Sequence, residues 1–93
     1  METKSVLVVD DSSTVRKFVS VSLEMQGFTV TPACDGMDAL EKLPTKKYDL
    51  IITDLNMPNM DGFELIKALR DNEEYRELPV IILTSLSGET DKE

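Results

Sequence analysis

The chain has 93 residues, 41% of them hydrophobic and 30% charged, which is the composition of one globular domain over residues 1–93. Its net charge of -8 argues against nucleic acid or an anionic membrane surface as the main partner, since both repel an acidic protein. Without histidine, imidazole-based acid/base catalysis is excluded. The single cysteine, Cys34, allows no internal disulfide, which favours a cytoplasmic location.

A strand followed by a helix is predicted first. Residues 6–9 form a continuous apolar run, too short for a membrane span, which predicts a strand buried on both faces that ends at Asp10 and Asp11. Three residues are alternative caps of the next helix: Ser12, Ser13 or Thr14. Helical spacing predicts an apolar face: Val15, Phe18, Val19 and Leu23. Gly27 is placed to end that helix.

The second predicted strand lies at an edge of the sheet. It covers residues 28–33, and Pro32, which lacks an N–H group, is tolerated best at an edge. Asp35 and Gly36 then turn the chain into a short helix. Its apolar positions are Met37, Leu40 and Leu43.

The third predicted strand is the centre of the chain's chemistry. Its apolar run covers residues 50–52 and is followed at once by Asp54. Pro58 cannot continue a strand ladder, and Asp61 with Glu64 forms a capping pair for the next helix. The apolar positions predicted for that helix are Phe63, Ile66 and Leu69.

A fourth apolar run, residues 80–83, ends at Thr84 and completes the order βαβαβαβ. This alternation predicts an α/β fold with an open parallel sheet and right-handed crossovers. With the proline-marked strand at an edge, the predicted strand order is 2-1-3-4. The topological switch, where such sheets bind ligands, then lies between the first and third strands. The first strand ends at Asp10 and Asp11, and the third ends at Asp54.

Three carboxylates at one sheet edge repel one another and stay ionised together only around a cation. An all-oxygen ligand set of Asp10, Asp11 and Asp54 suits a hard ion such as Mg2+. Asp54 is placed to attack phosphorus and form an acyl phosphate, and Thr84 to donate its hydroxyl to the phosphoryl oxygens. Taken singly, four residues are more simply helix caps than catalytic groups: Asp10, Asp11, Ser12 and Asp61. Asp61 is assigned to capping alone. The joint pattern favours function.

Three segments carry a family resemblance: residues 6–12 (VLVVDDS), 49–62 (DLIITDLNMPNMDG) and 79–85 (PVIILTS). They resemble the receiver domain of bacterial two-component response regulators, in the chemotaxis-like single-domain variant. The resemblance implies a flavodoxin-like fold and a cytoplasmic signalling switch, not an enzyme. Its phosphodonor would be a sensor histidine kinase or a phosphotransfer protein.

The resemblance also implies a role for each site residue. Asp54 would be the phosphoacceptor, and Thr84 the switch hydroxyl. Mg2+ would be bound by Asp11, Asp54 and the backbone carbonyl of Asn56, with Asp10 acting from further out or through water.

The family pattern continues beyond the last strand predicted here. A helix, a fifth strand and a last helix follow in the family, so the sequence predicts a C-terminally truncated receiver without them. An invariant family lysine at the end of the fifth strand has no counterpart, because Lys92 lies in the wrong element. Strand 4 would then be an exposed edge through which the chain self-associates.

Two alternatives to the phosphorylated switch therefore stand. One is a truncated or engineered receiver fragment that acts as a self-associating structural module without phosphorylation. The other is a Mg2+-dependent phosphatase with an aspartyl nucleophile, which the sequence disfavours because Asn56 stands where such enzymes place a second acid.

Overall fold

Four parallel strands form one sheet in the order β2-β1-β3-β4, as predicted. The computed structural model describes residues 3–57 and 59–83. The strands are β1 (Ser5–Val9), β2 (Thr29–Ala33), β3 (Leu50–Asp54) and β4 (Val80–Leu83). The helices are α1 (Ser13–Met25), α2 (Gly36–Lys42), the 3-10 turn η1 (Leu43–Thr45) and α3 (Gly62–Arg70). This is the flavodoxin-like α/β fold that the sequence predicts.

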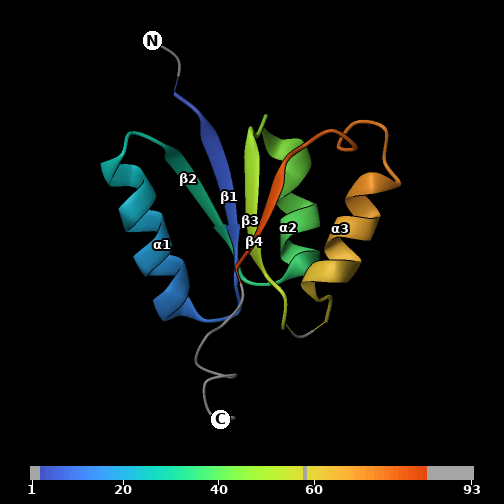
Figure 1. The fold of residues 1–93 in the computed structure, drawn as a ribbon, viewed down its shortest axis with the longest axis horizontal. Coiled ribbons are helices and arrows are strands. Elements are labelled where there is room, and N and C mark those ends of the chain that lie inside the picture. The colour runs from blue at the N-terminus through green and yellow to red at the C-terminus, as the bar shows by residue number, and fades with distance from the viewer. Residues whose placement is uncertain (1–2, 58, 84–93) are drawn as a thin grey trace.

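Helices cover the two faces of the sheet unequally. Figure 1 shows α1 on one face and α2 with α3 on the other, and the carboxyl ends of the strands meet at the lower edge of that view. The α2/α3 face buries the larger core, which includes Leu7, Ile51, Leu65 and Leu69. The α1 face buries a smaller core of Val6, Val8 and Ile52. Apolar side chains on both faces of β1 and β3 therefore fix these two strands at the centre of the sheet.

The predicted apolar face of α1 is only partly correct. Val19 and Leu23 pack against the smaller core, but Phe18 is 72% exposed and Val15 is also exposed. The helix packs over β2 and β1. The apolar residues on one side of its predicted face therefore lie beyond the part of the sheet that the helix covers. No residue of α1 is fully buried.

The start of α3 agrees with the prediction, whereas its buried face differs. The Asp61 side chain accepts a hydrogen bond from the Glu64 N–H and the Glu64 side chain accepts one from the Asp61 N–H, which forms a capping box. Leu65 and Leu69 are fully buried, but the predicted core residue Phe63 is exposed. Phe63 follows the buried Gly62 in the first turn of α3, on a side of the helix that faces away from the core. Within the described residues, no helix combines the length and apolar character needed to cross a membrane.

Candidate functional site

The site is built by two neighbouring strand ends. β1 and β3 pair in parallel with Val9 opposite Thr53, so Asp10 and Asp54 emerge side by side at the same edge. Both are buried, Asp10 at 5% and Asp54 at 6% exposure, while Asp11 is exposed. One carboxylate oxygen from each of the three residues lies within 4.8 Å of the other two. The structure thus brings together the three acids that the sequence placed at the topological switch.

Backbone N–H groups orient the two buried carboxylates. Asp10 Oδ1 accepts a hydrogen bond from the Ser12 N–H at 2.8 Å, and Asp54 Oδ1 accepts one from the Leu55 N–H at 2.9 Å. The Arg16 guanidinium, which the sequence analysis did not single out, donates to the backbone carbonyl of Asp10 at 2.7 Å. Arg16 therefore holds the end of β1. Within the described part of the chain, hydrogen bonds occupy only one oxygen of each of these two carboxylates.

The electrostatics of the site favour a bound cation. Burial raises the pKa of Asp10 above its ordinary value; the Ser12 N–H opposes this shift, and the charges of Asp54 and Asp11 add to it. A divalent ion among the three oxygens would offset that repulsion. The donor set is entirely carboxylate, which is the chemistry that Mg2+ prefers. The residues present therefore fit a magnesium ion.

An open cavity of about 330 Å³ lies beside the carboxylates and is lined by Asp11, Asn56, Met57 and Asp61. Asn56, predicted as a metal ligand through its carbonyl, is thus at the cavity wall. Asp61 caps α3, as the sequence predicts, and it also borders this cavity. The loop between β3 and α3 is short, so it keeps Asp61, at the start of α3, close to the end of β3. The predicted switch residue Thr84, together with Ser85 and Pro58, lies outside the described residues.

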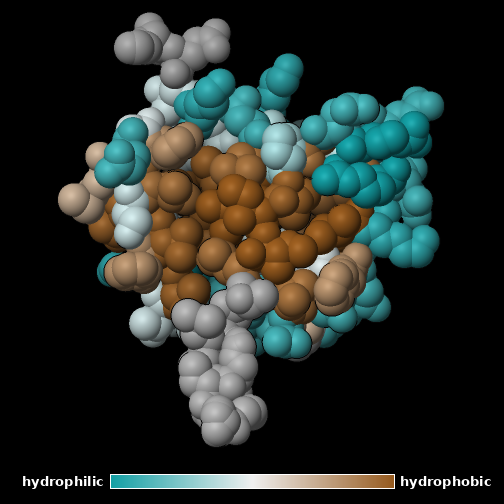
Figure 2. Space-filling model, in the orientation of Figure 1, coloured by the Kyte–Doolittle hydropathy of each residue, from teal (hydrophilic) through white to brown (hydrophobic). Residues whose placement is uncertain are grey.

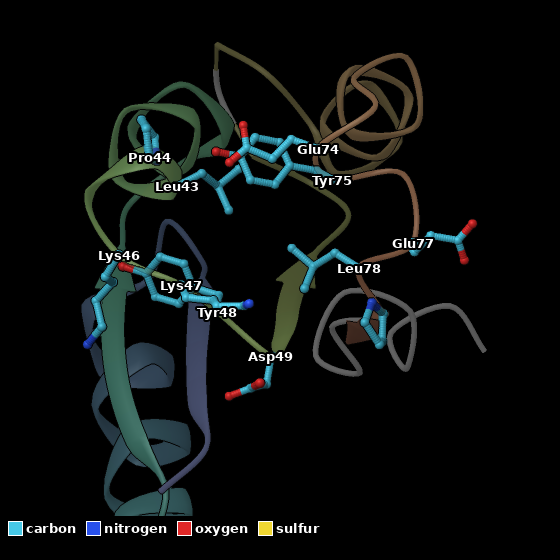
Figure 3. A pocket seen from close by; sticks show the side chains of 11 residues that line it. Leu43, Pro44, Lys46, Lys47, Tyr48, Asp49, Glu74, Tyr75, Glu77 and Leu78 are labelled. Carbon is cyan, nitrogen blue, oxygen red and sulfur yellow. The ribbon is translucent and has the colours of Figure 1, made fainter. Parts of the chain in front are cut away.

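A larger cavity, of about 570 Å³, lies at the other end of the strands from the carboxylates, where β3 and β4 begin. Figure 3 shows the rings of Tyr48 and Tyr75 and the side chain of Leu78 arranged around it. The Arg70 guanidinium fixes one wall by donating to the carbonyls of Tyr75, Arg76 and Leu78. None of the three clustered carboxylates lines it. The larger cavity is therefore separate from the acidic site.

Comparison with known proteins agrees with the geometry. Over 92 residues the chain is 44% identical to the Sensor protein EvgS of Escherichia coli (strain K12), an alignment that takes in 99% of this chain and 8% of that protein. The chain thus spans a small fraction of the length of this curated relative.

Two solved structures share the fold. The chemotaxis response regulator CheY4 of Vibrio cholerae superposes with a TM-score of 0.86 at 41% identity, covering 98% of this chain and 76% of that one. The response regulator TrrA of Thermotoga maritima, solved in complex with Mg(2+)-BeF, gives a TM-score of 0.83 at 31% identity, covering 97% and 76%. Residues 6–93 match the family described as the response regulator receiver domain, and the chain belongs to that family.

Proposed function

We propose that the chain is a phosphoacceptor switch of two-component signalling, phosphorylated on Asp54 with the help of Mg2+. The observation that carries this proposal is the cluster of three carboxylates within 4.8 Å at the ends of β1 and β3. The Mg2+-containing structure of the related TrrA supports it. The phosphodonor would be the phosphohistidine of a sensor histidine kinase or phosphotransfer protein, in the cytoplasm.

The residues of this chain would divide the work. Asp10, Asp11, Asp54 and the Asn56 carbonyl would hold Mg2+, with Asp10 acting directly or through water. When bound, the ion neutralises charge on the carboxylates and on the phosphoryl oxygens. An oxygen of Asp54 would attack phosphorus as the P–N bond of phosphohistidine breaks. The electron pair of that bond returns to the imidazole nitrogen, and the product is an acyl phosphate on Asp54. Thr84 would donate its hydroxyl to the transferred group.

The reaction can be tested with a small phosphodonor. The chain is incubated with Mg2+ and acetyl phosphate, and its intact mass is measured. We expect one added phosphoryl group, absent in Asp54→Asn and retained in the matched variant Asp49→Asn. Asp49 is a suitable control because it precedes β3, at the other end of the strand, where it accepts a hydrogen bond from the Ser5 N–H. A folded chain that gains no phosphoryl group would overturn the proposal.

A second candidate function, self-association, is supported by β4. Among the described residues β4 pairs only with β3, and Ile81 and Ile82 are 49% and 37% exposed. In the view of Figure 1, β4 is the strand nearest the reader. Figure 2, drawn in the same orientation, shows hydrophobic residues gathered in the middle of this face. An open apolar strand edge is complementary to a second strand edge of the same kind. We propose β4 of a second copy as its partner, related by a two-fold axis.

Sedimentation across a range of concentrations tests this pairing. We expect the wild-type chain to self-associate and Ile81→Lys, which places a charge on the edge, to remain monomeric. Thr29→Lys is the matched control, because Thr29 is an exposed residue on β2, the opposite edge strand. A wild-type chain that is monomeric throughout would overturn the β4 proposal and leave the phosphorylation proposal intact.

A further inference from the structure

One side-chain hydrogen bond ties the loop after β3 to the start of α2. Asn59 Nδ2 donates to Asp35 Oδ2 at 2.7 Å, between residues that are 24 positions apart. The other oxygen, Asp35 Oδ1, accepts the Asp38 N–H at 2.8 Å and caps α2. Asp35 is only 9% exposed. Both oxygens of this buried carboxylate are therefore used, one for the helix and one for the loop.

The loop adopts an unusual backbone conformation where it meets Asp35. Among the described residues, Asn59 is the one non-glycine residue with a positive φ, at 68°. Asparagine tolerates this left-handed region better than most residues, but the conformation still needs support from its surroundings. The charge-assisted hydrogen bond to Asp35 supplies such support.

Close packing holds the same loop against α2. A side chain at Gly36 would place its Cβ 2.6 Å from Met60 Cγ and 2.9 Å from the Met60 carbonyl oxygen. Only glycine allows this approach. A hydrogen bond from the Gly62 N–H to the Leu55 carbonyl at 2.9 Å joins the two ends of the loop to each other. Asn59 and Met60 therefore pack against the start of α2, in a loop whose ends are held together.

This loop also carries part of the candidate metal site. Asn56 and Met57 line the cavity beside Asp11, whereas neither Asp35 nor Asn59 does. Asn56 precedes Asn59 by three positions in the same connection between β3 and α3, so the position of Asn59 bears on where the Asn56 carbonyl can lie. Asp35 and Asn59 can thus influence a metal ligand without touching the metal.

We propose that Asp35 and Asn59 are positioning residues for the carboxylate site, and that their hydrogen bond fixes the loop that presents the Asn56 carbonyl to Mg2+. This inference rests on the proposed function, because it assumes that the site binds Mg2+. A purely structural contact would affect stability alone. A positioning contact also sets the affinity for the ion.

The test is calorimetric titration of each variant with Mg2+, together with its urea denaturation in the absence of Mg2+. Asn59→Gly removes the amide and keeps a residue for which φ of 68° is unstrained. Asn72→Gly is the matched control, because Asn72 lies in the connection after α3, where it accepts the Glu74 N–H. Asn59→Asp replaces the donor by a second carboxylate that faces the carboxylate of Asp35. The exchange Asp35→Asn with Asn59→Asp reverses donor and acceptor at unchanged net charge and keeps a good cap at position 35.

We expect Asn59→Gly and Asn59→Asp to raise the Kd for Mg2+ about tenfold, the scale seen when a group supporting a metal ligand is lost. Asn72→Gly should leave the Kd unchanged, and the exchanged pair should restore it. A wild-type Kd retained by Asn59→Gly, or an exchanged pair as weak as Asn59→Asp, would overturn the positioning role. A wild-type chain that binds no Mg2+ would instead overturn the proposed function on which that role rests.

Discussion

The carboxylates of Asp10 and Asp54 lie side by side because β1 and β3 pair in parallel with Val9 opposite Thr53. Both are almost completely buried, and the exposed Asp11 adds a third negative charge nearby. Burial and these neighbouring charges raise the pKa of Asp10. Without a cation the ionised Asp10 carboxylate therefore opposes folding at neutral pH, as is common where a protein concentrates charge for function.

Replacing Asp10 by asparagine should stabilise the chain at neutral pH in the absence of Mg2+. A raised pKa in the folded state means that protonation favours folding, so this contribution is complete below the ordinary value of 3.8 and is lost as pH rises through the raised pKa. Asparagine resembles the protonated acid and can still accept the Ser12 N–H. We expect a gain of roughly 1 kcal/mol in the free energy of unfolding, measured by urea denaturation.

The gain from Asp10→Asn should disappear below pH 3.8, where the wild-type carboxyl is itself protonated in both states. Asp71→Asn, a change in the exposed residue that follows α3, should show no such gain. Destabilisation of Asp10→Asn at neutral pH would indicate that the Asp10 charge is already compensated in the fold.

Mg2+ should raise the Tm of the chain, because an ion that binds only the folded state shifts the unfolding equilibrium. At a free concentration 100 times its Kd, the ion would add about 2.7 kcal/mol to the free energy of unfolding. Asp11→Asn should retain the stability of the metal-free chain, since Asp11 is exposed, and lose most of the Mg2+ effect. Thermal scans with NaCl at matched ionic strength separate ion binding from screening. An equal rise in Tm in NaCl would contradict a specific site.

The strand order and the acidic cluster could be predicted because both depend on local sequence. Pro32 assigns its strand to an edge, and continuous apolar runs assign β1 and β3 to the centre. Once the order is known, a parallel sheet must bring Asp10 and Asp54 to the same edge.

Other features depend on tertiary packing that no local pattern encodes. Helical spacing identifies residues that share a face, but not how much of that face the sheet covers, so Phe18 and Phe63 were expected in the core and are exposed. The hydrogen bond between Asn59 and Asp35 joins two loops that are distant in sequence. The sequence signals near it are Asp35 and Gly36, which predict a turn there, and glycine also permits close approach.

Acid should weaken the fold partly through Asp35. The hydrogen bond from the Asp38 N–H, and then that from Asn59, lower the pKa of Asp35 below its ordinary value of 3.8. A lowered pKa means that the ionised form favours folding, so this contribution is present above pH 3.8 and is lost as pH falls through the lowered pKa. Asp35→Asn cannot accept both hydrogen bonds with one amide oxygen, so it should lower the free energy of unfolding at neutral pH.

Urea denaturation as a function of pH measures this difference for Asp35. The gap between the wild-type chain and Asp35→Asn should narrow as the pH falls below 3.8. Parallel stability curves for the two proteins would show that the charge of Asp35 contributes nothing to folding.

Gly62→Ala should disturb the fold and the acidic site together. A Cβ at position 62 would lie 2.5 Å from the Asp54 carbonyl oxygen and 3.0 Å from Leu55 Cα, and both are backbone atoms at the end of β3, beside the carboxylate cluster. Because backbone cannot yield as a flexible side chain does, we expect a loss of roughly 1–3 kcal/mol in the free energy of unfolding. Mg2+ affinity, measured by calorimetric titration, should fall as well, since the end of β3 must move.

Gly27→Ala separates these two effects. Gly27 has a φ of 96°, so alanine is strained there, but no atom lies within 4 Å of the added Cβ, and the position follows α1 at the far end from the carboxylates. This variant should lose about 1–2 kcal/mol of stability and bind Mg2+ with unchanged affinity. If Gly62→Ala also kept the wild-type Mg2+ affinity, the contact of Gly62 with Asp54 would matter for folding alone, and the geometry of the acidic site would not depend on how closely α3 approaches β3.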